Sequence, residues 1–173
     1  QVSSTAVPLS ALLRIPFRVF NIRTRRSNPG LRPQHFAAVK AVTRLTGARV
    51  EGLEVGSSEI VFTPGGAEVL EATLDVGTAG SVPLVLQALM PVLAFSSRGA
   101  SLVLKGGTNN PRAPPIDYVK EVLARSLVEM GYRVYVSVER RCFYPRCGGV
   151  VRFSSKTVEV LRAVNLTGFQ GLH

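Results

Sequence analysis

One order of segments repeats along the chain, and this repeat restricts the fold more than any other feature. Each half reads as helix, strand, loop, helix, strand, strand, with an offset of roughly eighty residues. The register is visible in Thr46-Gly47-Ala48-Arg49-Val50, which aligns with Met130-Gly131-Tyr132-Arg133-Val134, and in Asn28-Pro29, which falls near Asn110-Pro111. We therefore predict two similar α/β units, each with a strand-to-helix loop of the kind that binds ligands in open α/β sheets.

Hydrophobic periodicity and turn residues place the elements. Helices are predicted over 1–13, 33–45, 83–95 and 116–130, and strands over 15–22, 50–55, 59–63, 69–76, 101–105, 133–139 and 150–153. In the second helix, Phe36, Val39, Val42 and Leu45 share one face, and Gly47 follows where a helix-ending glycine belongs. In the first helix, Pro8 predicts either a kink or the first turn of a shorter helix.

Composition restricts the partners. The 173 residues carry a formal charge of +10, and 46% of them are apolar, so a folded core and a polyanionic partner are both expected. Nucleic acid fits better than a membrane surface, because no basic amphipathic helix stands out. The longest apolar run, 83–95, contains Gln87 and Pro91 and is too short to cross a bilayer.

The two cysteines, Cys142 and Cys147, are too few for a disulfide framework and lack partners for a four-ligand zinc site. This usage fits an intracellular protein and leaves pairing of the two cysteines open. The chain starts at Gln1 as if a helix were already under way, which predicts a trimmed beginning rather than a signal peptide.

The stretch 22–35 is the strongest candidate for an anion site. It contains no acid, and its candidate anion-binding residues are Arg23, Arg25, Arg26, Arg32, Gln34 and His35. Guanidinium groups match phosphate oxygens two at a time, and the start of the following helix adds a positive dipole. A solvated basic loop is the alternative, and His35 on its own would be read as a hydrogen-bonded structural residue.

The second unit offers glycine-containing loops. The turn 77–81 opens a helix and could hold phosphate, although a short glycine turn has little specificity. In the loop 106–115 and just after it, a flat ring could pack between Pro114 and Tyr118, unless Tyr118 only anchors its helix to the core. Gln87 is polar in an apolar helix and needs a partner if it is buried.

The segment 140–149 mixes basic and aromatic residues, as RNA-contacting loops do, and a strained hairpin is the alternative. Walker, serine-elbow and HExxH motifs are absent from the sequence.

Five motifs in order resemble the RNA 3′-terminal phosphate cyclase family. They are Ile22-Arg23 with Arg26 and 28–35, the 77–81 turn with Leu86-Gln87, Gly106-Gly107-Thr108-Asn109-Asn110-Pro111, Ala113-Pro114-Pro115-Ile116-Asp117-Tyr118, and Phe143-Tyr144-Pro145 with Gly148-Gly149. The resemblance spans the whole chain, which would cover about the first half of a member.

The implied fold is α/β (α+β), with tandem units of two helices packed on a four-stranded sheet. Repeat 1 would span about 1–66 and repeat 2 about 67–155, and 156–173 would begin the link to an inserted domain and a C-terminal repeat.

The resemblance also implies an activity. Family members use ATP and a divalent metal (Mg²⁺ or Mn²⁺) to convert an RNA 3′-phosphate into a 2′,3′-cyclic phosphate, through an adenylylated histidine and an RNA adenylate. By resemblance, Arg23, Arg26, Gln34 and His35 would hold RNA or nucleotide phosphates. Gln87 would lie in the nucleotide and metal site, with Pro114 and Tyr118 beside the adenine. RNA 3′ ends and ATP would be the partners, in the cytoplasm or, in a eukaryote, the nucleus.

Several departures accompany the resemblance. The family's nucleophilic histidine belongs to the C-terminal unit, and His173 is not in its motif, so no catalytic residue is expected in this chain and it should not adenylylate itself. The acidic glycine-rich segment expected before Gln1 is missing, Ser4 replaces the usual arginine, and Cys142 and Cys147 replace glycine-like positions. The alternative function is a non-catalytic RNA-binding relative acting in ribosomal RNA processing or assembly.

Overall fold

The computed structural model describes residues 2–77, 80–111, 113–143 and 148–164. The first unit contains α1 (Val2–Leu13), β1 (Phe17–Val19), α2 (Pro33–Thr46), β2 (Arg49–Glu51) and β3 (Ile60–Thr63). The second contains β4 (Glu71–Asp75), α3 (Val82–Ala94), β5 (Ala100–Gly106), the π-helical segment η1 (Tyr118–Leu123) continuing into α4 (Ala124–Glu129), β6 (Val134–Arg140) and β7 (Gly149–Ser155).

Two separate sheets confirm the mixed α/β class. In the second unit the strand order is β4-β5-β7-β6, with β4 parallel to β5 and the other neighbours antiparallel. The first sheet has the order β1-β3-β2 and is antiparallel throughout. It thus shows three strands within the described residues instead of the four expected; in the second unit, the additional strand β4 precedes α3.

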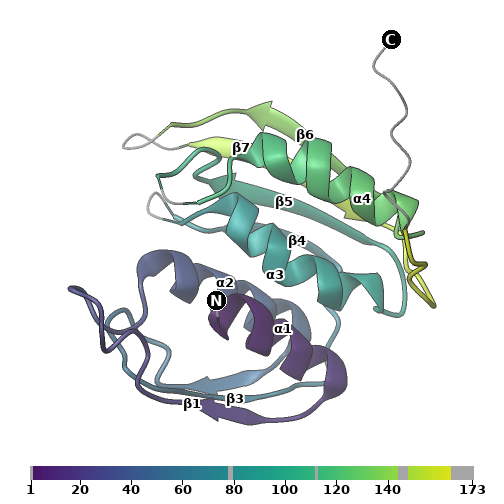
Figure 1. Ribbon diagram of the computed structural model, residues 1–173. Helices are drawn as coiled ribbons and strands as arrows, with labels where there is room; N and C mark the ends of the chain where they lie inside the picture. Colours follow the sequence, from purple (N-terminus) through teal and green to yellow (C-terminus); the bar gives the residue numbers. More distant parts are fainter. Residues whose placement is uncertain (1, 78–79, 112, 144–147, 165–173) are drawn as a thin grey trace.

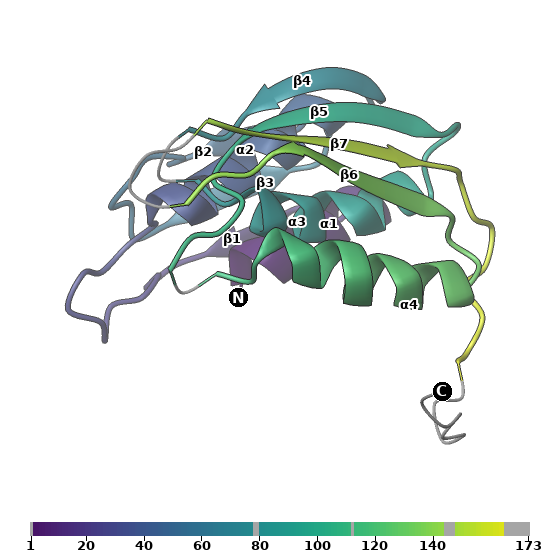
Figure 2. The same ribbon diagram turned by 90° about the horizontal axis from the view of Figure 1, so that it is seen from above.

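Helix α3 lies at the centre of the molecule, and it contacts α1, α2 and the second sheet (Figures 1 and 2). Its sequence explains the position, because a helix that is apolar on nearly all sides must be buried. Ser81 begins the helix by accepting a hydrogen bond from Leu84 N–H at its hydroxyl oxygen. The core residues of α3 include Val82, Val85, Leu86, Leu89 and Leu93.

The predicted helices are confirmed to within a few residues. Helix α2 ends at Gly47, whose φ of 63° lies in the left-handed region that favours glycine. Helix α1 runs from Val2 through Pro8, so the shorter helix starting at Pro8 is wrong. The helix predicted over 116–130 contains the π-helical segment η1, in which Ala124 N–H bonds to Val119 O.

Two strands end three or more residues earlier than predicted, and the strands predicted over 59–63 and 69–76 are reduced to Ile60–Thr63 and Glu71–Asp75. The strand predicted over 15–22 is reduced to β1, because Asn21 and Arg23 both have a φ of 57° and turn the chain away. The strand predicted over 50–55 stops at Glu51, since Gly52 has a φ of 70°. Both errors concern residues that continue the apolar pattern beyond the point where a partner strand is available.

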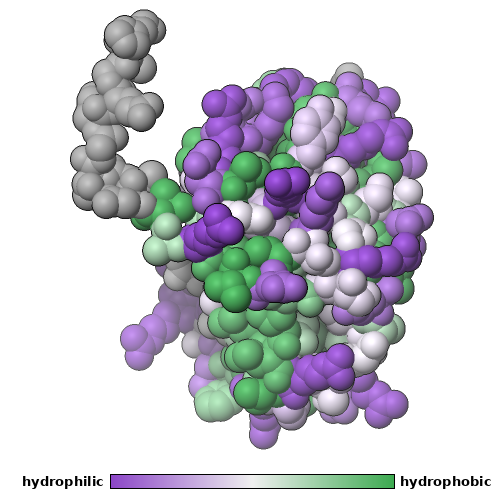
Figure 3. Space-filling model, turned by 90° about the vertical axis from the view of Figure 1, so that its right-hand side faces the viewer, coloured by the Kyte–Doolittle hydropathy of each residue, from purple (hydrophilic) through white to green (hydrophobic). Residues whose placement is uncertain are grey.

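The two ends of the molecule differ. The segment that joins β1 to α2, the ends of β4, β5 and β6, and the starts of α3, η1 and β7 all lie at the left in Figure 1, and Figure 2 agrees. Helices α1 and α3 end at the opposite side, where hydrophobic side chains form a band bordered by hydrophilic ones (Figure 3). Within the described residues, no helix combines the length and hydrophobicity that crossing a membrane requires.

Candidate functional site

The basic loop between β1 and α2 is fixed to the β2–β3 loop through its backbone. Gly30 N–H donates to Ile22 O (2.8 Å), Leu31 N–H to Ser57 O (2.9 Å), and Gly56 N–H to Leu31 O (2.7 Å). Gly30 has a φ of 77°, and a Cβ there would lie 2.1 Å from the carbonyl oxygen of Gly56. Only glycine therefore permits this approach of the two loops.

The arginines of this loop lack acidic partners. Arg23, Arg25 and Arg26 are exposed, and Arg32 is half-buried. None of the four forms an ion pair within the described residues. Arg26 N–H bonds to Arg23 O at 3.0 Å, which places both residues in one turn. Such uncompensated guanidinium groups on an anchored loop are suited to binding phosphate oxygens.

His35 lies in the first turn of α2 and is half-buried. Its Nδ1 accepts a hydrogen bond from Arg32 N–H at 3.3 Å, so the neutral ring carries its proton on Nε2 and can donate it to an oxygen. Burial, and then the positive charges of Arg23 and Arg32, lower the pKa of His35 below its ordinary value. Gln34, the residue before it, is also half-buried. The structure thus brings Arg23, Arg32 and His35 into one electrostatic environment.

The two glycine-containing loops of the second unit, before α3 and after β5, are hydrogen-bonded to each other. Asn110 Nδ2 donates to Gly80 O (3.0 Å), and Val82 N–H donates to Gly107 O (2.9 Å). Gly107 must lack a side chain, because a Cβ there would lie 2.0 Å from Asn110 Oδ1. This amide oxygen is buried and has no hydrogen-bond partner among the described residues, which leaves one acceptor unused where the loops meet.

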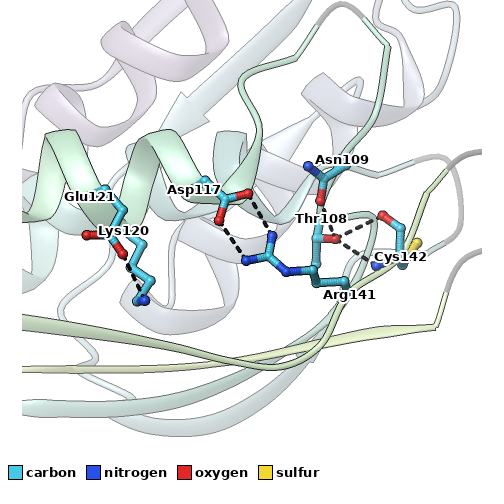
Figure 4. Close-up of polar contacts among 7 residues, drawn as sticks. All are labelled: Thr108, Asn109, Asp117, Lys120, Glu121, Arg141 and Cys142. Atoms are coloured by element: carbon cyan, nitrogen blue, oxygen red, sulfur yellow. Dashed lines mark hydrogen bonds and ion pairs between the residues drawn. The ribbon is translucent and has the colours of Figure 1, made fainter.

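A buried hydroxyl joins the second loop to the end of β6. Thr108 Oγ1 accepts from Cys142 N–H (2.8 Å) and donates its single proton either to Cys142 O (2.9 Å) or to Asn109 Oδ1 (2.8 Å), as Figure 4 shows. Thr108 itself is fully buried. Its side chain is therefore a structural connection between two loops, one of which precedes η1.

Two arginines of the segment 140–149, Arg140 and Arg141, have partners inside the protein. The two outer nitrogens of Arg141 donate to the two carboxylate oxygens of Asp117 at 2.6 and 2.7 Å (Figure 4). The hydrogen bonds and charge of Arg141 lower the pKa of Asp117. Arg140 donates to the carbonyl oxygen of Gly148. The predicted RNA contact of this segment is therefore not supported at Arg140 and Arg141, and residues 144–147 lie outside the described residues.

The three residues predicted to meet a nucleotide occupy different surroundings. Tyr118 is 43% exposed, so Ile116 and Val119, both buried, anchor this helix to the core instead. Pro114, in the loop between β5 and η1, is half-buried. Gln87 is half-buried in α3, where it lines an apolar hollow that also includes Leu123. Among the described residues that line this hollow, neither Pro114 nor Tyr118 is present.

A hollow of about 570 Å³ lies between the two units. Pro33, from the first turn of α2, lines it on one side, and Gly77 and Gly80, from the loop that precedes α3, line it on the other. The N-termini of α2 and α3 lie at the same end of the molecule (Figure 1). Their positive dipoles and the basic loop together favour anions at this end.

The described residues contain no group of three or more His, Cys, Asp or Glu side chains that could hold a metal ion. Gln87 would supply one neutral amide oxygen, whereas Mg²⁺ binds through carboxylates, waters and phosphates. The metal site at Gln87 therefore stays a prediction.

The sequence patterns missed Thr108, Asn110, Asp117 and Arg141 as the residues that hold the loops together. Asp117 and Arg141 are 24 residues apart, so nothing local signals their pairing. The repeated order of elements offered one signal, because it places the loop after β5 and the loop after β6 in one unit.

Comparisons with known proteins agree with the motifs. The model of the family described as RNA 3′-terminal phosphate cyclase matches residues 1–167. Similar curated proteins with the name RNA 3′-terminal phosphate cyclase come from Desulfurococcus amylolyticus, 47% identical over 98% of this chain, and from Caldivirga maquilingensis, 48% identical over 96%. A third, from Hyperthermus butylicus, is 47% identical over 96%.

The chain spans about half the length of these curated relatives, at 50%, 48% and 46% of their sequences respectively.

Proposed function

The chain belongs to the RNA 3′-terminal phosphate cyclase family, and from this premise we propose that it provides the RNA-phosphate and nucleotide-binding part of an ATP-dependent cyclase. The reaction would convert an RNA 3′-terminal phosphate into a 2′,3′-cyclic phosphate. One observation carries the proposal: an anchored arginine loop without acidic partners lies at the same end of the molecule as the N-termini of α2 and α3.

The basic loop would bind the terminal phosphate of the RNA. Arg23 and Arg26 are exposed and able to neutralise its charge, and Gln34 would donate from its side-chain amide. His35 would donate its Nε2 proton to a phosphate oxygen, because its Nδ1 already accepts from Arg32 N–H. These groups would hold the terminal nucleotide so that its 2′-hydroxyl lies beside the phosphorus.

The loops of the second unit would bind the nucleotide. When bound, ATP supplies an adenylyl group that turns the terminal phosphate into an electrophile. The backbone of the 77–81 turn, at the N-terminus of α3, would face the nucleotide phosphates, with Pro114 and the exposed ring of Tyr118 beside the adenine. Gln87 would complete this site from α3. The nucleophilic histidine of the family would come from outside this chain.

The first test compares two RNAs of identical sequence that end in a 3′-phosphate or a 3′-hydroxyl. We expect the protein to bind the phosphorylated RNA more tightly, and Arg26→Ala to remove most of the difference. Equal affinity for the two ends would contradict the cyclase proposal and favour the alternative, a non-catalytic RNA-binding relative that acts in ribosomal RNA processing or assembly.

The second test concerns catalysis. The protein is incubated with ATP labelled in its α-phosphate, in the presence of Mg²⁺ or Mn²⁺, and the adduct is assayed for acid lability. A protein that supplies the complete activity gives a labelled adduct and a cyclic RNA end. If the chain alone gives no adduct but retains its preference for a 3′-phosphate, the binding role stands and the nucleophile lies elsewhere.

A further inference from the structure

The hollow between α2 and β4 continues beyond the candidate phosphate site. Along α2 it is lined by Phe36, Lys40 and Arg44, which recur every fourth residue and so form one stripe of the helix. The stripe begins one turn after the N-terminus of α2 and extends about 12 Å, given a rise of about 1.5 Å per residue. The opposite wall is the end of β4, which is the edge strand of its sheet. In Figures 1 and 2, α2 lies beside β4.

The charge of this groove is positive. Lys40 and Arg44 are both exposed, and neither forms an ion pair in the part of the chain that the structure describes. The ammonium of Lys40 lies over the ring of Phe36, 5.6 Å from its centroid, which holds the charge on the wall of the groove. Asp75 is the only acid that lines the groove among the described residues, and its Oδ1 accepts a hydrogen bond from Gly77 N–H at 2.8 Å.

We propose that this groove binds the single-stranded RNA immediately upstream of the terminal phosphate, with Lys40 and Arg44 contacting successive backbone phosphates. The inference rests on the proposed function and adds to it a second subsite, which selects for chain length rather than for the terminal group. A polyanion suits two unpaired cations spaced along one helix face, and a strand whose end is held near His35 enters the groove at Pro33.

An extended peptide pairing with the edge of β4 would be the other occupant of such a groove. The charge argues against it, because pairing of peptide backbone with an edge strand makes no use of Lys40 or Arg44. The two occupants can be distinguished by RNA affinity. If RNA occupies the groove, Lys40 and Arg44 contribute to the affinity for RNA; if a peptide occupies it, they do not.

The test measures the affinity of the full chain for a 3′-phosphorylated 12-nucleotide RNA and for adenosine 3′-monophosphate. The double variant Lys40→Ala/Arg44→Ala should bind the 12-mer about 25-fold more weakly at about 0.1 M salt, and the salt slope should fall by about 1.4, or about 0.7 for each lost contact with a single strand. Affinity for the mononucleotide should stay unchanged.

Arg49→Ala/Lys156→Ala is the matched control, because it removes the same two charges from exposed positions on strand β2 and directly after strand β7. This control should bind the 12-mer nearly as the unmodified protein does. Equal losses in the two double variants, or no loss in the groove variant, would overturn the proposal. Thermal unfolding of each variant separates these outcomes from misfolding.

A second measurement locates the RNA directly. A 12-mer with 4-thiouridine at the third position from its 3′ end should crosslink to the segment 33–44, whereas the same RNA labelled at its 5′ end should not. Crosslinking elsewhere would overturn the groove assignment. The proposed function is tested separately, with the two RNAs that end in a 3′-phosphate or a 3′-hydroxyl. Equal affinity for those two RNAs would count against the proposed function rather than against the groove assignment.

Discussion

His35 is held by one hydrogen bond that determines what its ring can do. With Nδ1 accepting from Arg32 N–H, the neutral side chain has a single donor, Nε2, to offer a ligand. Burial and the neighbouring guanidinium groups favour this neutral form. A bound phosphate would have the opposite effect, because its negative charge stabilises the imidazolium.

The pH dependence of binding follows from these two effects. Since the pKa of His35 is lowered in the free protein and a bound anion raises it, binding takes up a proton as the pH falls below about 6.5, the ordinary value for histidine. Affinity for a 3′-phosphorylated RNA should therefore increase from pH 7.5 to 5.5 relative to His35→Gln.

The RNA phosphate also titrates in this pH range, and comparison with His35→Gln corrects for that effect. A phosphate monoester gains a proton near pH 6, which weakens binding on acidification in both proteins. The prediction concerns the ratio of the two affinities, measured by fluorescence anisotropy at constant ionic strength. A ratio that does not change with pH would mean that His35 does not face the phosphate.

The exposed arginines of the basic loop can be tested one at a time. Arg23→Ala and Arg26→Ala should each weaken RNA binding and reduce the slope of log affinity against log salt concentration by about 0.7. Arg25→Ala is the matched control, since Arg25 is exposed in the same loop but has no assigned contact. Equal slopes for all three variants would show that the loop contributes only general charge.

Among the connecting elements, the contact between the basic loop and the β2–β3 loop depends on Gly30 having no side chain. Gly30→Ala should lower the free energy of unfolding by more than about 1 kcal/mol, because it combines a φ of 77° with a Cβ 2.1 Å from Gly56 O. Gly131→Ala separates the two causes: Gly131 has a φ of 94° but no atom within 4 Å of a Cβ.

Urea unfolding of both variants measures the difference. Gly30→Ala should be the more destabilised, and it alone should reduce affinity for RNA. If Gly131→Ala costs as much, backbone strain explains the whole effect and the close approach of the loops is unimportant.

The Asp117–Arg141 pair connects the start of the last helix to the end of β6. Because this pair lowers the pKa of Asp117, its stabilisation is present above the unfolded-state pKa of about 3.9 and is lost as the pH falls through the lower folded-state value. Both side chains are 46% exposed, so the contribution is about 1 kcal/mol at most.

Asp117→Asn should therefore lower stability by no more than that amount at pH 7, and the variant and the unmodified protein should become equally stable near pH 2. Chemical unfolding at the two pH values tests this. A difference that persists at pH 2 would assign the effect to packing rather than to charge.

The sequence was sufficient for elements whose limits are local. Gly47 and Ser81 mark helix ends through their own conformation or side chain, and both helices were predicted closely. It was insufficient where the limit depends on a distant partner. The strand predicted over 15–22 was too long because no pattern shows that Asn21 leaves the sheet, and the pairing of Arg141 with Asp117 was missed because the two residues are remote in sequence.

At the scale of the whole molecule, the repeat places the candidate loops at one end. Both strand-to-helix loops of the second unit and the basic loop of the first share that end (Figure 1). The order of elements predicted one ligand-binding loop in each unit, and the structure adds that these loops share one end, opposite the hydrophobic band in Figure 3.

Helix α3 belongs to the second unit by sequence, yet it packs on α1 and α2 of the first. The two units therefore share one core and should unfold together. Calorimetry should show a single transition whose calorimetric and van't Hoff enthalpies agree. Two resolved transitions would mean that each unit is stable alone. If the transition is single, cleavage of the chain between β3 and β4 would yield halves that fold only in each other's presence, so the repeat preserves an order of elements without preserving an independent folding unit.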